Sequence, residues 1–254
     1  MRGHKSSRPC NHGKVHGIER TPAFMQKIII IGAGGFGRET AFLIEEINRR
    51  KQCWDLLGFL DEDVTMHGKF LNGYSVLGGL DWCLNHSNTA VACAIGNPQS
   101  RKKVVGILLK QSETQFPNLI HPNVINYPGN IFKAGNIVHP GNIINVDVTV
   151  GNYVCFEMGS TIGHDVVIGD FVSVMPGVNM AGNVVLEEGC FLGTGCSIIQ
   201  KKRIGKWSIV GAGSVVIDDV PPYSTVVGVP ARVVKRDANF KMQNPNLKIT
   251  SYNS

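Results

Sequence analysis

The stretch that decides the fold runs from Val148 to Ile199 and reads VTVGNYVCFEMGSTIGHDVVIGDFVSVMPGVNMAGNVVLEEGCFLGTGCSII. Read in steps of six, it places a large apolar residue at one recurring position. The same step extends outward from Ile120 to Val216, and sixteen of these seventeen positions are apolar, with Asn126 as the exception. Neither the 3.6-residue period of a helix nor the alternation of a single strand produces this pattern.

Each six-residue unit therefore predicts a short strand and a turn that send one large side chain inward. Three units make a coil of 18 residues, and stacked coils bury one another's cores through backbone pairing. Residues 120–221 then form between five and six coils. A second inward position carries small or β-branched residues, among them Cys190 and Cys196.

Residues 26–115 show a different pattern. Ile28–Ile31 predicts a buried parallel strand, followed by the glycine-rich turn 32–37 and a helix from Glu39 to Arg50. A second strand over 56–60 ends in Asp61-Glu62-Asp63. A third, over 90–95, ends at Gly96 and precedes a helix over 98–110.

Gly32, Gly34 and Gly37 form a G-x-G-x-x-G turn between a strand and a helix. Glycines at this place let backbone N–H groups approach a phosphate, and Asp61 is placed to accept hydrogen bonds from a ribose or base. The alternative is a tight turn that needs glycine for its geometry alone. Only half of a doubly wound sheet is present, so we expect a site for the nucleotide end of a larger substrate, with no bound NAD.

Composition excludes several classes of protein. Hydrophobic residues make up 43% of the 254 residues, which excludes disorder of the whole chain. No apolar run approaches the ~18 residues of a membrane span, which excludes a membrane-spanning helix. Of the net charge of +6, residues 1–24 supply +4, and we expect them to form a disordered extension or tag. We therefore expect no nucleic-acid partner and no membrane association. The seven cysteines are odd in number and contain no CxxC pair. Because we see no export signal, we expect reduced thiols and a cytoplasmic location.

Five motifs carry a resemblance that runs from Met25 to Lys235: IGAGGFGRE (31–39), GFLDED (58–63), AIGNPQSRKK (94–103), GHDVVIGD (163–170) and VVGVPAR (226–232). The chain resembles the hexapeptide-repeat sugar acetyltransferases, which include bacterial nucleotide-sugar N-acetyltransferases and sialic-acid-type O-acetyltransferases. The resemblance implies an α/β half-Rossmann domain over 25–115, then an all-β left-handed parallel β-helix over 116–235 and a tail over 236–254. It also implies a homotrimer with acetyl-CoA as co-substrate, no permanently bound cofactor and no metal.

The resemblance assigns the acceptor site and the general base. The nucleotide-sugar site is implied to involve Gly34, Gly35, Phe36, Asp61, Glu62 and Gly96, and the base is implied to be His164 with Asp165 beside it. The chemistry agrees, because a histidine with a pKa near ~6.5 can accept a proton at neutral pH. A neighbouring carboxylate orients the ring and favours its charged form.

The 18-residue coil places Gly182 directly beside His164 in the next coil. Its backbone N–H could hold the thioester oxygen as charge develops on it. The resemblance adds Thr194 and Ala212 as acetyl-CoA contacts, and Ser173 where some relatives have a second histidine. The basic run 201–203 could meet CoA phosphates, or it could be a solvated turn.

Glu157 stands where relatives usually show asparagine. The coil register stacks it with His121 and His139. We hypothesise that Glu157 binds an ammonium or hydroxyl group of the acceptor with His139 beside it. The alternative is a stack of side chains that satisfy one another.

The function implied is acetyl-CoA-dependent N-acetylation of a nucleotide-linked amino sugar, a 4-amino-4,6-dideoxyhexose, for bacterial surface polysaccharide such as O-antigen. The mechanism implied is direct attack with His164 as general base. The alternatives are O-acetylation of a sialic-acid-type sugar, a metal-dependent hydratase and a silent scaffold. The hydratase needs a histidine spacing that is absent here. The nucleotide (UDP, dTDP, GDP or CMP) and the sugar stay open.

Overall fold

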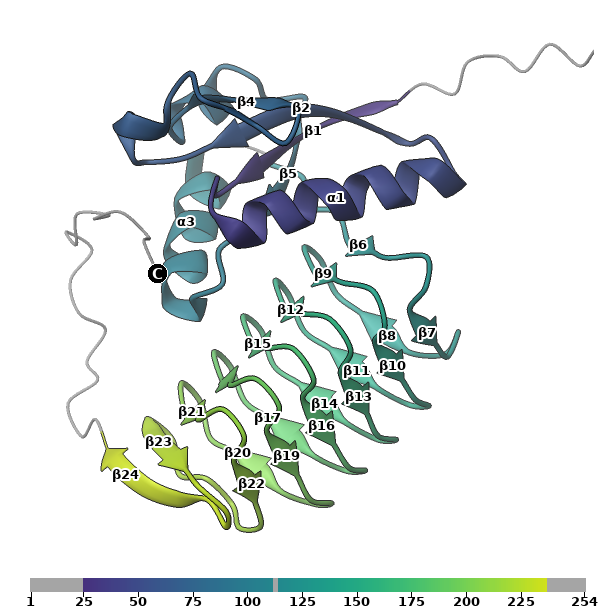
Figure 1. Cartoon of the computed structure of the whole chain (residues 1–254), viewed down its shortest axis with the longest axis vertical. Helices are drawn as coiled ribbons and strands as arrows, with labels where there is room; N and C mark the ends of the chain where they lie inside the picture. The colour runs from purple at the N-terminus through teal and green to yellow at the C-terminus, as the bar shows by residue number, and fades with distance from the viewer. Residues whose placement is uncertain (1–24, 112–113, 237–254) are drawn as a thin grey trace, which may run out of the picture.

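The computed structural model describes residues 25–111 and 114–236, so the predictions for 1–24 and for most of the tail lie outside the described residues. Two units follow one another along the chain. An α/β unit lies across one end of a long stack of coils, and a short hairpin closes the other end (Figure 1).

The α/β unit is built on a five-stranded sheet in the order β3-β4-β2-β1-β5. All neighbouring strands are parallel except β3 and β4. The strands are β1 (Gln26–Ile31), β2 (Trp54–Leu60), β3 (Phe70–Leu71), β4 (Tyr74–Gly78) and β5 (Ala90–Cys93). The helices are α1 (Gly35–Arg50), the short α2 (Asp81–Leu84) and α3 (Pro98–Gln111), with a 3-10 turn η1 (Val64–Met66).

This unit departs from the prediction in several places. Strands β1 and β2 each begin two residues before the predicted start, at Gln26 and Trp54. Helix α1 begins at Gly35 instead of Glu39, and β5 ends at Cys93 instead of residue 95. The elements between residues 64 and 84 carry no clear hydrophobic period and were not predicted at all.

The stack is made of short strands in three sheets, each of which runs along its length. The first sheet contains β6 (Leu119–Ile120), β9 (Ile137–Val138), β12 (Cys155–Phe156), β15 (Ser173–Val174), β18 (Phe191–Leu192), β21 (Ile209–Val210), β23 (Ser224–Val227) and β24 (Arg232–Arg236). The second contains β7 (Ile125–Asn126), β10 (Ile143–Ile144), β13 (Thr161–Ile162), β16 (Asn179–Met180), β19 (Ser197–Ile198) and β22 (Val215–Val216). The third contains β8 (Ile131–Phe132), β11 (Thr149–Val150), β14 (Val167–Ile168), β17 (Val185–Leu186) and β20 (Arg203–Ile204).

Strands pair with an offset of 18 residues, as Cys155 does with Ser173, so the predicted coil length is correct. The second residue of each strand points inward, and from Val138 to Val216 these side chains are buried. Asn126 lies in the first coil, at the end of the stack opposite the hairpin, where it is half-buried and accepts a hydrogen bond from Asn130 at 2.9 Å. Cys190 and Cys196 are in the core as predicted, and all six cysteines of the described residues are free thiols.

The corners of the coil share one backbone conformation. Every sixth residue from 135 to 213 has a positive φ, between 56° and 77°. One corner is glycine in each coil, and a second carries Asp147, Asp165, Asn183 and Lys201. The third carries, in order, Gly135, Tyr153, Phe171, Gly189 and Trp207. Because residues other than glycine rarely adopt this region, the packing of the coils must hold them there.

The two units share their cores. The outward residues Leu119, Ile137 and Cys155 of the first sheet pack with the β1 and α1 side chains of the α/β unit. Phe116 and Phe171 join the cluster on the other face of β1. Helix α1 therefore lies over the coils that carry β6, β9 and β12 (Figure 1). The predicted fold class, an α/β domain followed by a parallel β-helix, is confirmed.

Candidate active site

The glycine-rich turn after β1 contains glycines of two kinds. Gly32 has a φ of 102°, and a Cβ there would lie 2.7 Å from the Ala94 carbonyl oxygen. A Cβ on Gly37 would meet the Gly32 carbonyl at less than 3.0 Å. These two glycines are required by packing. Gly34 and Gly35 are exposed and face open space, so neither close packing nor a positive φ requires glycine there.

Helix α1 starts at this turn with Gly34 as its N-cap and without a side-chain cap. Its first backbone N–H groups therefore point outward with no side chain to satisfy them. Such a helix start binds phosphate well, because the N–H groups and the helix dipole both favour negative charge.

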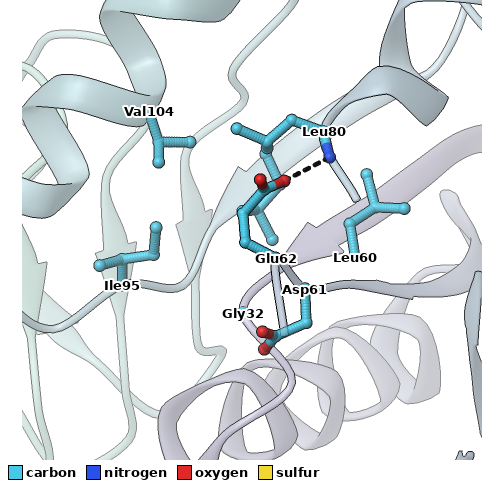
Figure 2. A pocket seen from close by; sticks show the side chains of 8 residues that line it. Gly32, Leu60, Asp61, Glu62, Leu80, Ile95 and Val104 are labelled. Atoms are coloured by element: carbon cyan, nitrogen blue, oxygen red, sulfur yellow. Dashed lines mark hydrogen bonds between the residues drawn. The ribbon is translucent and has the colours of Figure 1, made fainter. Parts of the chain in front are cut away.

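Two carboxylates follow β2 beside this turn (Figure 2). Asp61 accepts hydrogen bonds from the N–H groups of Ala33 and Asp63, both at 2.9 Å, and so ties the turn to the end of β2. Glu62 accepts one from the Leu80 N–H at 2.7 Å. Together with apolar side chains such as Ile95 they line a small pocket.

Gly96 follows β5 and also faces open space. The predicted acceptor residues of the α/β unit thus lie after the C-terminal ends of three neighbouring parallel strands, β1, β2 and β5. This edge is where open α/β sheets bind ligands.

Glu157 and His139 lie where α1 covers the stack. Their exposures are 7% and 2%, and the His139 ring lies 5.6 Å from the ring of Phe36 on α1. Burial, and secondarily the charge of Glu39, raises the pKa of Glu157 to about 7. Burial, with a smaller effect of His121, lowers the pKa of His139 to about 4. Within the described residues the Nε2 atom of His139 has no hydrogen-bond partner.

His164 lies at the corner between β13 and β14, and its side chain is 53% exposed. Its Nδ1 is 2.7 Å from Oδ2 of Asp165, which occupies the positive-φ position of that corner. Since a carboxylate can only accept, Nδ1 carries the hydrogen, and in the neutral ring Nε2 then presents its lone pair. A Cβ at Gly182 would lie less than 3.0 Å from three atoms of the ring, Nε2 included.

The predicted acetyl-CoA residues do not meet within one chain. Gly182 lies at the same corner as His164. Thr194 and Ala212 are exposed and lie one coil apart at the glycine corner. The sheet that contains β16 and β19 separates the two corners. Ser173 is fully buried, and its hydroxyl donates to the Gly96 carbonyl at 2.7 Å. The predicted contact of Ser173 with acetyl-CoA does not fit this position.

The basic run 201–203 has partners of its own. Arg203 forms an ion pair with Glu187 at 2.9 Å, and its N–H donates to Asp219. Lys201 occupies a positive-φ corner. These contacts favour the solvated-turn interpretation.

Sequence reasoning missed Arg101, a residue of α3 that is 1% exposed. It stands beside Lys102 and Lys103, so the run has the appearance of a solvated helix face. In the described ranges, no three His, Cys, Asp or Glu side chains gather as a metal-binding group. No helix in these ranges has the length and hydropathy to cross a membrane.

Known proteins share the order of an α/β unit followed by a stack of coils. Residues 27–108 match the family of the PglD N-terminal domain. WeeI from Acinetobacter baumannii is 32% identical, with a TM-score of 0.74 over 82% of this chain and 100% of that one. The acetyltransferase domain of PglB from Neisseria gonorrhoeae, in complex with acetyl coenzyme A, is 27% identical, with a TM-score of 0.74 over 83% of this chain and 100% of that one.

A variant of perosamine N-acetyltransferase from Caulobacter crescentus, in complex with CoA and GDP-perosamine, is 27% identical, with a TM-score of 0.73 over 82% of this chain and 97% of that one. Curated relatives are matched over shorter stretches. A galactoside O-acetyltransferase from Lactococcus lactis is 34% identical over 41% of this chain, and the match spans about half (52%) of that protein. This chain matches the whole length of WeeI, and it has the α/β unit and the coils described above. It therefore belongs to the hexapeptide-repeat family of sugar acetyltransferases.

Proposed function

We propose that this protein transfers the acetyl group of acetyl-CoA to the amino group of a nucleotide-linked 4-amino-4,6-dideoxyhexose, in the cytoplasm, for a bacterial surface polysaccharide. The observation that carries the proposal is the pair of His164 and Gly182. The imidazole is oriented by Asp165, and its free Nε2 faces a position that lacks a side chain. The relatives in complex with CoA and GDP-perosamine, or with acetyl coenzyme A, support the choice of both substrates.

In the proposed reaction the sugar amine attacks the thioester carbonyl carbon while Nε2 of His164 takes a proton from the nitrogen. As the C–N bond forms, the carbonyl oxygen becomes an oxyanion near the Gly182 N–H, which makes no hydrogen bond within the described residues. The C–S bond then breaks, and the protonated histidine returns the proton to the leaving CoA sulfur. The enzyme forms no covalent bond.

The acceptor is held at the strand ends of the α/β unit and at the adjoining coil. In this proposal Gly34, Gly35 and Phe36 receive the diphosphate, Asp61, Glu62 and Gly96 surround the nucleoside, and Glu157 binds the sugar. A buried carboxylate with a raised pKa gains most from a ligand that brings a positive charge or a hydrogen-bond donor. Glu157 therefore receives the ammonium or a hydroxyl of the acceptor, with His139 beside it, and an ammonium held there loses one proton to water before it attacks as the amine.

The proposed acetyl-CoA residues lie on two corners of the coil, separated by a sheet. A single groove can contain Gly182, Thr194 and Ala212 if it forms between two copies of the chain. We therefore include a homotrimer in the proposal, because three copies around one axis repeat the same contact three times and close the ring. Light scattering of the purified protein measures the number of copies.

The experiment that tests the function measures thiol release from acetyl-CoA with a panel of UDP-, dTDP- and GDP-4-amino-4,6-dideoxy sugars, CMP-sialic acid and free sialic acid. Turnover with one amino sugar, lost in His164→Ala, supports the proposal and names the substrate. Turnover only with a sialic acid contradicts it in favour of O-acetylation. For the acceptor contact, an unchanged acceptor KM in Glu157→Gln would contradict a role of Glu157 in binding.

A further inference from the structure

Arg101 joins the two units of the chain through six acceptors. Its Nε donates to the Tyr153 carbonyl at 2.9 Å, and its Nη2 donates to the carbonyls of Phe171 and Val172 at 2.9 and 3.1 Å. Nη2 also bonds the Ser173 hydroxyl at 2.9 Å. On the other side, Nη1 donates to the carbonyls of Ile95 and Gly96.

This cation is buried without a carboxylate. None of the ion pairs among the described residues includes Arg101, and its acceptors are five main-chain carbonyls and one hydroxyl. A buried charge is tolerated only where its donors are satisfied, and the planar fork of a guanidinium can bond in several directions at once. The arrangement fixes the loop after β5 against the coil corners at 153 and 171–173.

The Gly96 peptide lies at the centre of this network. Its carbonyl accepts both from Arg101 at 3.2 Å and from Ser173 at 2.7 Å. On its other side, a Cβ at position 96 would meet nothing within 4 Å. One side of the peptide is thus held by the stack, and the other side is open at the ligand-binding edge of the sheet.

We propose that Arg101 and Ser173 are positioning residues for the acceptor: they hold the Gly96 loop at the height and angle at which it contacts the nucleotide. The inference rests on the proposed function of that edge as the nucleotide-sugar site. It gives Ser173 a role different from the predicted acetyl-CoA contact.

Lys102 provides a matched comparison. It is the next residue of α3 and also joins the two units, through an ion pair with Glu188. Its Nζ lies over the rings of Phe171 and Trp207, at 5.8 and 5.2 Å from their centroids. It has no contact with Gly96 among the interactions of the described residues. A purely structural role of the interface would make Lys102 and Ser173 equivalent.

The experiment uses the full chain and measures affinities for UDP, GDP, dTDP and CoA by calorimetry. Ser173→Ala removes one donor to Gly96, and we expect about a threefold to tenfold loss of affinity for whichever nucleotide binds. CoA affinity should stay within about twofold, since the proposed CoA residues do not touch this network. Ser173→Thr restores the hydroxyl and should restore binding, and Lys102→Ala should bind both ligands as the wild type does.

Arg101→Lys should lose more nucleotide affinity than Ser173→Ala, because one ammonium cannot reach carbonyls on both sides of the interface. If Arg101→Lys does not fold, Ser173→Ala decides alone. Unchanged nucleotide affinity in Ser173→Ala overturns the inference, as does a loss of CoA affinity in its place. Failure of the proposed function is seen separately: the wild-type protein then binds no nucleoside diphosphate, and the inference falls with it before any variant is compared.

Discussion

The ring of His164 occupies the space that a side chain at position 182 would fill. Because the ring is more than half exposed, it can swing toward solvent when that space is taken, and the fold need not change. In Gly182→Ala we therefore expect kcat to fall about a hundredfold, the usual consequence of displacing a general base by about 1 Å. The melting temperature should change by no more than about 2 °C.

The control for this substitution is Val146→Ala, which shortens the side chain at the same corner in the preceding coil. It leaves the His164–Gly182 side untouched and should retain kcat within about twofold. Equal activity of Gly182→Ala and the wild type would contradict a catalytic role of the His164 ring in its present position.

Glu157 and His139 impose opposite pH dependences on stability. The pKa of Glu157 is about 7 in the fold, so between pH 4.5 and 7 the folded state holds a proton that the unfolded chain has lost, and the free energy of unfolding falls as pH rises. The pKa of His139 is about 4, so between pH 4 and 6.5 the unfolded chain holds the extra proton, and the free energy of unfolding rises with pH. The two contributions offset one another over most of this window.

Glu157→Gln removes one side of this balance. We expect the free energy of unfolding of the variant, relative to that of the wild type, to increase as pH rises from 4.5 to 7, by up to about 3 kcal/mol. Urea unfolding at pH 4.5, 5.5 and 7.5 measures the difference. A difference between the two proteins that does not vary with pH would show that Glu157 is not neutral in the fold at low pH.

At the scale of elements, the turn between β1 and α1 contains one glycine that packing requires, Gly37, and one that faces open space at the proposed nucleotide site, Gly34. Gly37→Ala would press a methyl group onto the Gly32 carbonyl and force the strand and the helix apart, which should cost more than about 2 kcal/mol of stability. Gly34→Ala meets open space at a φ of −73°, so stability should be retained. Its methyl group would cover the uncapped start of α1, and we expect about a tenfold loss of nucleotide affinity.

Chemical denaturation and calorimetry with the best-binding nucleoside diphosphate measure the two effects in this pair of variants. If Gly34→Ala binds nucleotide as the wild type does, phosphate does not approach the helix at this turn, and the site would have to lie elsewhere on the sheet edge.

The repeated elements were predictable because each coil inserts side chains at a fixed step. That step also predicted that Gly182 lies beside His164. The corners were not predictable, since Tyr153 and Trp207 adopt positive φ values against their own preference. Their rings pack closely on the preceding coil, where glycine leaves the space: a Cβ on Gly135 or Gly189 would collide with them.

Other features depend on contacts that no local pattern records. Arg101 stands in a charged run, and five of its six acceptors are main-chain carbonyls, two at 95 and 96 and three between 52 and 71 residues further along the chain. The burial of His139 and Glu157 depends on α1 packing over them. Sequence placed them in one stack but could not show what covers it.

At the scale of the whole molecule, the proposed groove between two chains has a distinctive consequence. His164→Ala damages one corner of the coil, and Thr194→Trp would block the other. Each variant alone should be inactive. When the two are co-expressed and assemble at random, about a quarter of the grooves pair an intact His164 corner with an intact Thr194 corner.

We therefore expect the mixture to recover about a quarter of the wild-type kcat, measured by thiol release from acetyl-CoA. A mixture of two separately purified variants that cannot exchange chains serves as the control and should stay inactive. If the co-expressed mixture is inactive as well, each groove is built within a single chain.

The strict offset of 18 residues from β6 to β22 restricts how such a chain can change in length. Duplication of 18 residues beyond Gly182 would return every inward and corner residue to its place and lengthen the stack by one strand spacing, about 4.8 Å. An insertion of six would preserve the inward pattern but rotate all later coils by one face. Most other insertions would turn core residues toward solvent. The distance from the His164 corner to the end of the stack can therefore grow or shrink only in whole turns, so the length of the proposed CoA groove would change in steps of about 4.8 Å.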